Sequence, residues 1–322
     1  MKGRFGLTTF GAALACAGLF GCGGGGGGGG SSGLPQPPST PIAITASNIG
    51  QVTDASLDPA VGGTGVFGAS TSSADTPQSN PGVLLRAMRS VSSQAQKPRS
   101  TSSGLSDAPV TEACAISGSV TIDESVNSAT IRFNACSDAI GQLINGSVTA
   151  TGIVEGSTSF QATFSVDITF TESGSQPLRM VGNFSISENC PTATTCTGVF
   201  SGSSLGAAHG SEVWFISSFS ITSSENGAGV LQVTASYTVS SSDLNGSVSV
   251  ITDQPILVQV GNATYPHGGV VRVTGANNSS AVITMNNVPP SDPTAVSVQI
   301  DANGDSTFET TRLFSWTELE AM

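Results

Sequence analysis

The sequence predicts a mainly β protein in which a large antiparallel meander curls into a barrel or half-barrel, with one or two short N-terminal helices packed on it. From residue 113 onward apolar and polar residues alternate with a period of two, which is typical of strands that bury one face. Turn signals separate the alternating runs, and no helical pattern interrupts residues 113–322. Strands joined as hairpins form an antiparallel sheet, and about twelve to fourteen of them are too many for an open, strongly twisted sheet.

The clearest strand runs from Phe160 to Phe170, where every even position is apolar and every odd position is polar. We expect such a strand to have one buried and one wet face. Similar alternation predicts strands near residues 144–154, 178–186, 213–221, 231–239, 244–251, 256–260, 269–274, 281–286 and 295–300. In one of these runs, we expect four apolar residues to share a face: Val213, Phe215, Phe219 and Ile221.

Composition narrows the range of partners. The chain has 322 residues, of which 38% are apolar and only 10% are charged, with a net charge of -12. A chain with this charge would be repelled by the phosphates of nucleic acid and by anionic lipid headgroups. We therefore expect no nucleic-acid partner, and any membrane attachment should depend on acyl chains.

The first residues form a secretory signal. Lys2 and Arg4 precede an apolar run over residues 7–20, which is shorter than the ~20 apolar residues of a spanning helix. We therefore assign residues 1–21 to a signal peptide, which ends just before Cys22.

The string Leu19-Phe20-Gly21-Cys22 resembles the lipobox of bacterial lipoproteins. This resemblance implies that Cys22 is lipidated and becomes the mature N-terminus, so that a lipid anchor holds the protein at the cell envelope. Gly23 stands where an Asp would resemble a signal for retention in the inner membrane. The resemblance therefore implies an outer-membrane or cell-surface location.

Three further regions follow the signal. Residues 22–46, rich in Gly and Pro, are expected to form a tether, flexible in its glycine half and extended in its proline half. Residues 47–112 are a helical and linker region, with a short helix near 47–60 and a stronger apolar helix over 80–92. We expect the 80–92 helix to dock on the apolar face of the sheet. Residues 113–322 form the antiparallel β domain.

Four cysteines remain after Cys22, and their even number in an exported chain predicts two disulfides. Four cysteines allow three connectivities, of which pairing between sequence neighbours is favoured: Cys114 with Cys136 and Cys190 with Cys196. A four-cysteine zinc site is disfavoured by these spacings. Matching the apolar residues of the first hairpin sets Ile122 opposite Ala129, so a bulge or irregular strand end is needed to close the first disulfide.

One acidic stretch is the best candidate for an ion site. Oxygen-bearing side chains recur at Asp301, Asn303 and Asp305, with Glu309 further on, and they resemble the start of a calcium loop. Arg312 stands where such a loop has its bidentate Glu. The alternative is an Asn-Gly hairpin turn between two strands. Calcium is the only cofactor that the sequence indicates.

The sequence contains few residues in an arrangement that could catalyse a reaction. Residues 202–206 match the G-x-S-x-G string of a nucleophile elbow and His209 follows, but no helix is predicted after them. The chain has only two histidines and no paired carboxylates in an obvious cleft sequence. We therefore do not expect an enzyme.

Two hypotheses about function follow from the predicted architecture. In outline a curved sheet with helices is similar to periplasmic lipoprotein carriers, which enclose acyl chains, although no motif is shared. By this similarity the chain would be a lipid-anchored envelope protein that binds an apolar or lipid-like ligand. The alternative is a structural or adhesive surface lipoprotein without a ligand. An interior that is filled by the protein's own side chains would favour the alternative.

Overall fold

The computed structural model describes most of the β domain and a short part of the chain before it. The described residues are 33–57, 109–125, 127–138, 140–156, 158–192, 195–225, 229–259, 265–286 and 291–319. Three predictions lie outside these residues: the signal with Cys22, the glycine half of the tether, and the helix over residues 80–92.

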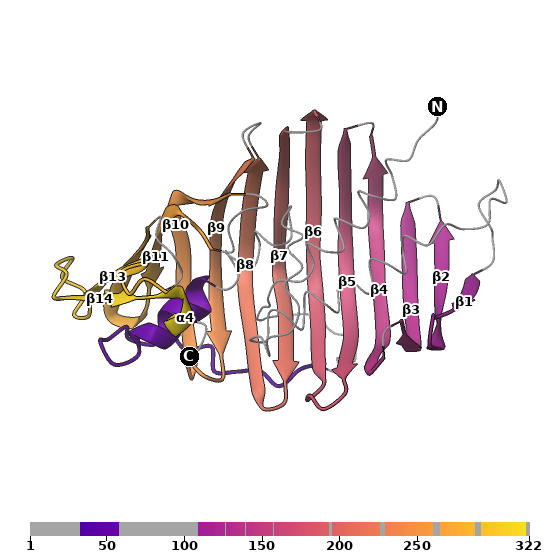
Figure 1. Cartoon of the computed structure of the whole chain (residues 1–322), viewed down its shortest axis with the longest axis horizontal. Helices are drawn as coiled ribbons and strands as arrows, with labels where there is room; N and C mark the ends of the chain where they lie inside the picture. Colours follow the sequence, from indigo (N-terminus) through magenta and orange to yellow (C-terminus); the bar gives the residue numbers. More distant parts are fainter. Residues whose placement is uncertain are drawn as a thin grey trace.

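A single antiparallel sheet of fourteen strands dominates the structure, and its spatial order is the order of the sequence, β1 to β14 (Figure 1). The predicted meander is therefore confirmed. The strands are β1 Val110–Ala113, β2 Ser117–Ser125, β3 Ser128–Ser137, β4 Gln142–Glu155, β5 Ser159–Glu172, β6 Leu178–Thr192, β7 Thr195–His209, β8 Glu212–Glu225, β9 Val230–Ser241, β10 Gly246–Gln259, β11 Gly268–Thr274, β12 Ser280–Met285, β13 Val296–Asp301 and β14 Thr310–Phe314. Two short helical elements complete the C-terminal part, η1 Ala276–Asn278 and α4 Trp316–Leu319.

The sheet is open, so of the two predicted forms the structure has the half-barrel and not the closed barrel. Among the described residues β1 pairs only with β2, and β14 pairs only with β13. The end strands are also the shortest at their ends of the sheet, with four and five residues, whereas central strands such as β6 have fifteen. Short end strands offer few hydrogen bonds with which to close a barrel.

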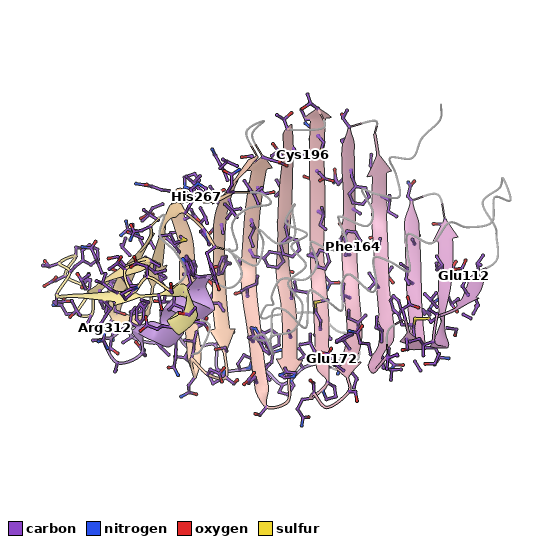
Figure 2. All side chains as sticks on the ribbon, viewed as in Figure 1. Glu112, Phe164, Glu172, Cys196, His267 and Arg312 are labelled. Atoms are coloured by element: carbon purple, nitrogen blue, oxygen red, sulfur yellow. A yellow bond between two sulfur atoms is a disulfide. The ribbon has the colours of Figure 1, made fainter. Side chains whose placement is uncertain are left out.

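Strand β5 explains why the sheet has one apolar and one polar face. Its side chains alternate strictly between exposed and buried from Ser159 to Ile168, as the sequence pattern predicted. On the apolar face, the rings of Phe164, Phe184, Phe200 and Phe219 form a row across β5 to β8, with successive ring centroids 5.1, 5.2 and 4.9 Å apart. Phe164 lies near the middle of the sheet (Figure 2). Each of these rings is 2% exposed or less, so they form the centre of the core.

Strand β8 departs from the predicted alternation. A bulge interrupts its pairing with β9 at Ser218, whose φ is 49°. An extra residue moves the side chains before it to the other face of the sheet. Val213 and Phe215 therefore lie on the opposite face from Phe219, where they pack against Leu34. The expectation that all four apolar residues of this run share a face is wrong.

Strand β10 is continuous where two strands were expected. Its pairing with β11 shifts between Thr252 and Gln254, and shifts again between Gln254 and Leu257. Pro255 lies within the second irregularity and has no N–H to donate to the ladder, which accounts for a local break without ending the strand.

The segment before the first helix, residues 33–46, crosses the sheet and is here called the N-terminal strap. The N–H of Ile42 donates to the carbonyl of Ser247 on β10 at 3.1 Å, and the carbonyl of Ile42 accepts from Ala276 at 2.7 Å. Ile44 is fully buried. These contacts show that this part of the expected tether is held against the sheet.

The helix predicted near residues 47–60 is present at residues 49–57 (Figure 1). Its apolar stripe of Ile49, Val52 and Leu57 is buried, as the spacing predicted. The hydroxyl of Tyr237 on β9 donates a hydrogen bond to the carbonyl of Ser56. The helix therefore packs on the apolar face of the C-terminal half of the sheet.

Both predicted disulfides are present. Cys114 and Cys136 have Cα atoms 5.5 Å apart, and Cys190 and Cys196 have Cα atoms 4.1 Å apart. The second pair lies at the β6–β7 hairpin, near one end of these long strands (Figure 2). Both pairs join cysteines that are neighbours in the sequence.

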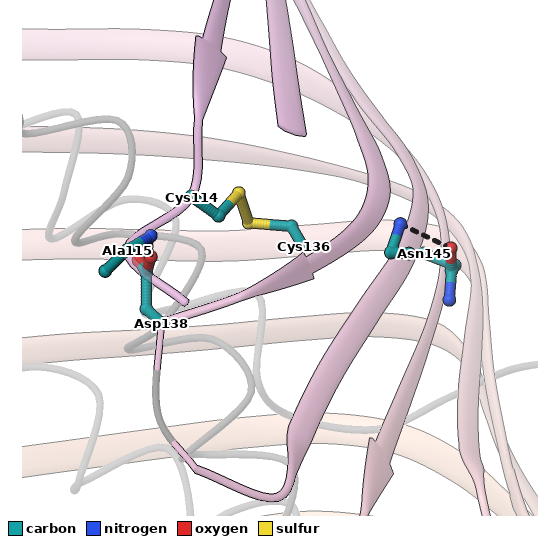
Figure 3. The surroundings of a disulfide bond; sticks show 6 residues. Cys114, Ala115, Cys136, Asp138 and Asn145 are labelled. Carbon is teal, nitrogen blue, oxygen red and sulfur yellow. Dashed lines mark hydrogen bonds between the residues drawn. A yellow bond between two sulfur atoms is a disulfide. The ribbon is translucent and has the colours of Figure 1, made fainter. Parts of the chain in front are cut away.

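The first disulfide depends on an irregular strand end, as expected (Figure 3). Pairing of β2 with β3 shifts near Ala135, whose φ is 48°, and the N–H of Ala135 donates to Asn145 Oδ1 at 2.8 Å. Asp138 Oδ1 accepts from the N–H of Ala115 at 2.7 Å, which holds the chain beside Cys114. The predicted register is nevertheless wrong by two residues.

In the structure, Ile122 pairs with Ile131 and not with Ala129. The hairpin turn lies one residue further along the chain than the predicted register requires, since Ser125 pairs with Ser128. A shift of two residues keeps every side chain on its face, so the alternation could not exclude it.

Candidate functional site

The acidic stretch forms the connection between β13 and β14. Asp301 is the last residue of β13. It is buried, with only 2% of its surface exposed. Ile300 pairs with Thr310, so the residues between them close a hairpin through a long loop. A hairpin was one of the two expected alternatives, but the loop is longer than a two-residue Asn-Gly turn.

Side-chain oxygens fold this loop around Asp301. Its Oδ1 accepts from the N–H of Gly304 at 2.7 Å and its Oδ2 accepts from Ser306 at 2.9 Å. Glu309 Oε2 accepts from the N–H of Ala302 at 2.9 Å. The buried carboxylate is therefore satisfied by main-chain donors, which is how a buried charge is tolerated.

Three carboxylates converge in this loop. Oxygens of Asp301, Asp305 and Glu309 all lie within 4.8 Å of one another, a distance at which one ion could contact all three. The N–H of Thr307 donates to Asp305 Oδ1 at 2.8 Å, and this bond lowers the pKa of the Asp305 carboxyl below its ordinary value. A cluster of ionised oxygens is the donor set that Ca²⁺ prefers.

Asn303 has a different position from the one the calcium interpretation gave it. Its Oδ1 accepts from the N–H of Asp305 at 2.8 Å, so the side chain stabilises the loop backbone. The structure therefore brings together three of the four predicted ligands, and it uses the fourth as a turn residue.

Element η1 packs against the loop at Gly304. Gly304 has a φ of +78°, and a Cβ placed on it would lie 2.4 Å from the carbonyl oxygen of Asn277. Only glycine fits this close approach without a shift of the backbone. The loop is thus fixed against the segment that also binds the N-terminal strap.

The G-x-S-x-G string lies inside a regular strand. Residues 202–206 belong to β7, and Ser204 pairs with Asn183 and Ser217 on the neighbouring strands. A nucleophile elbow requires a sharp turn from a strand into a helix, which this motif does not have. His209 ends the same strand, with its Nδ1 4.0 Å from Glu212 Oε2.

The polar face of the sheet was indicated by the sequence only as an alternating pattern. Hydroxyl pairs link neighbouring strands, such as Thr163 with Ser185 at 2.9 Å and Thr130 with Thr149 at 3.2 Å. Among the described residues ion pairs are sparse, and one joins Arg179 to Asp167 at 3.1 Å. Most of the polar face therefore offers hydroxyl and amide groups and little charge.

Glu188 is a residue that the sequence interpretation missed. Burial raises the pKa of its carboxyl, which lies close to the Cys190–Cys196 disulfide. Position 188 shares its parity with Ile186, so the period of two already placed this carboxylate on the apolar face. The disulfide sulfurs are not thiolates, and this group is therefore no metal site of the usual kind.

No protein-family model, curated protein or solved structure matches this chain. Within the described part of the chain, no helix has both the length and the apolar character needed to cross a membrane.

Proposed function

We propose that this chain is a lipid-anchored protein of a bacterial cell envelope, in which the sheet acts as a structural or adhesive surface module. The observation that carries the proposal is the separation of the two faces of the sheet. Apolar side chains of the central strands are covered, with Phe160, Phe164 and Phe170 at 0–2% exposed, while the alternate side chains of the same strand face solvent. An apolar face whose central side chains are already buried supports a structural module more than a carrier of acyl chains.

Anchoring depends on Cys22, which lies outside the described residues. The proposal is supported by the basic and apolar segments and by the string that ends at Cys22. A diacylglycerol-modified Cys22 would place the module at the outer membrane or the cell surface. Stable anchoring by acyl chains is consistent with a protein whose net charge of -12 disfavours electrostatic binding to anionic lipid.

The test is mass spectrometry of the mature N-terminus together with fractionation of the Cys22→Ser variant. We expect a lipidated Cys22 in the membrane fraction and loss of lipid and of membrane attachment in the variant. A soluble product cut elsewhere, with a distribution that Cys22→Ser leaves unchanged, would refute the anchor.

Binding of an apolar ligand is the second candidate function. The row of four phenylalanine rings across β5 to β8 supports it, because such an apolar face could hold an acyl chain in place of a protein segment. Native mass spectrometry of the full chain separates the candidates. A retained lipid of defined mass supports a carrier, and a spectrum of the protein mass alone supports the structural module.

Weak calcium binding by the loop of β13 and β14 is a further proposal about the same module. It is supported by the convergence of three carboxylates, and extracellular sites can work at about 10⁻⁴–10⁻³ M calcium. Such an ion would stabilise the loop. The proposal assigns no reaction to the chain.

A further inference from the structure

An open sheet has two edges, and here they are β1 and β14. Each pairs with its neighbour on one side, and no other described strand pairs with its outer side. The main-chain N–H and C=O groups along an edge are a template for a further strand. Neither edge strand contains proline, and Val110 and Leu313 are 45% and 52% exposed.

The directions of the two edge strands allow β1 of one copy to pair with β14 of another copy. Fourteen strands in strict antiparallel order leave β1 and β14 running in opposite directions. A second copy in the same orientation would therefore lay its β1 antiparallel to β14 of the first. The apolar and polar faces of the two copies would then be continuous.

Charge distinguishes this arrangement from pairing between identical edges. Glu112 pairs with Val120 and Arg312 pairs with Val298, and both valines are fully buried, so the two charged residues lie on the same face of the sheet. Two β14 strands in full overlap would set Arg312 opposite its own copy. Two β1 strands that pair about position 112 would likewise set their Glu112 carboxylates opposite each other.

Pairing β1 with β14 instead sets Glu112 opposite Arg312. This register also places Val110 opposite Phe314, so the apolar residues of the two edges match on the same face. One guanidinium N–H of Arg312 donates to the carbonyl of Ala46 at 3.4 Å. Since a guanidinium has five N–H donors, this long bond leaves others for a carboxylate.

We propose that β14 of one copy binds β1 of a second copy, so that the chain assembles head to tail. The contact is heterologous, because each copy contributes a different edge to each junction, and repetition of it produces a ring or an extended array. Assembly of this kind deepens the proposed role as a structural surface module, but it does not depend on the lipid anchor.

Charge reversal tests the proposal by sedimentation velocity on the purified full chain over a range of concentrations. The wild type should show a mass that rises with concentration. Arg312→Glu and Glu112→Arg should each lower the association constant by about tenfold, since attraction is replaced by repulsion at an exposed pair. The double variant should restore association. Gln232→Glu, on the polar face in mid-sheet, adds a negative charge away from both edges and should have no effect.

Mixing provides the decisive comparison. The Arg312→Glu and Glu112→Arg proteins should each associate more weakly alone than the wild type does, and they should form a complex with each other, because one supplies an acidic β14 and the other a basic β1. Far-UV circular dichroism and intact disulfides establish that each variant is folded. A wild type that stays monomeric at every concentration, or a folded Glu112→Arg protein that associates as the wild type does, would overturn the proposal.

Discussion

Ser279 Oγ accepts a hydrogen bond from the main-chain N–H of Ile44 at 2.8 Å, across a separation of 235 residues. The same hydroxyl donates to the carbonyl of Ala276 at 2.7 Å. Both Ser279 and Ile44 are fully buried, so no solvent can replace either bond. This one hydroxyl therefore joins the N-terminal strap to the segment that supports the β13–β14 loop.

We expect Ser279→Ala to destabilise the fold by about 1–3 kcal/mol, because it leaves the buried N–H of Ile44 without a partner. Urea unfolding measures the difference. Ser236→Ala, on the exposed face of β9, removes the same hydroxyl from a site where the change should stay within about 0.5 kcal/mol. Equal unfolding midpoints for the two variants would contradict the role of Ser279.

The two disulfides should differ in their contribution to stability. Their sequence separations are 22 and 6 residues, and a longer closed loop removes more entropy from the unfolded chain. Loss of Cys114–Cys136 should cost about 3 kcal/mol and loss of Cys190–Cys196 about 2 kcal/mol. Urea unfolding of the two double Cys→Ser variants tests the order, and the reverse order would contradict it.

Sequence alone predicted which residues are buried far better than it predicted register. In β5 the period of two assigned every side chain to its face, because burial depends only on parity. The bulge at Ser218 carries no comparable signal, since a non-glycine residue with positive φ is fixed by its surroundings. Val213 and Phe215 were therefore assigned to the wrong face.

Composition misled the interpretation of the N-terminal strap. Glycine and proline indicated a tether, but Leu34 and Ile44 provide two apolar contacts that hold it to the sheet. In the candidate ion site, the residue types predicted the donors. The role of Asn303 depends on the path of the loop, which spacing alone does not determine.

Glu188 should make stability depend on pH. Burial raises its pKa above the ordinary value of 4.5, so the folded state favours the protonated carboxyl. Its contribution to stability is fully present below pH 4.5 and is lost as the pH rises through the folded-state pKa. Glu188→Gln removes the charge, and we therefore expect it to melt at a higher temperature than the wild type at neutral pH.

The difference between Glu188→Gln and the wild type should shrink as the pH falls below 4.5, where the carboxyl is protonated in both states. Thermal melts across this range measure it. Glu225→Gln, at the end of β8, is the control, because it also removes one negative charge from this acidic protein. A constant difference at every pH would show that packing, and not ionisation, distinguishes Gln from Glu at this position.

Calcium should stabilise the protein through Asp301, Asp305 and Glu309, whose oxygens already lie within 4.8 Å of one another. At a free calcium concentration ten times the dissociation constant, binding to the folded state alone adds about 1.4 kcal/mol to the free energy of unfolding.

Asp305→Asn is the sharpest variant, because an amide oxygen can still accept from the N–H of Thr307 while the charge is lost. Calorimetry and urea unfolding should show binding for the wild type and a reduced effect for Asp305→Asn, whereas Asp243→Asn, in the exposed β9–β10 connection, should bind as the wild type does. Unfolding curves that millimolar calcium leaves unchanged would mean that these carboxylates serve only to fold the loop.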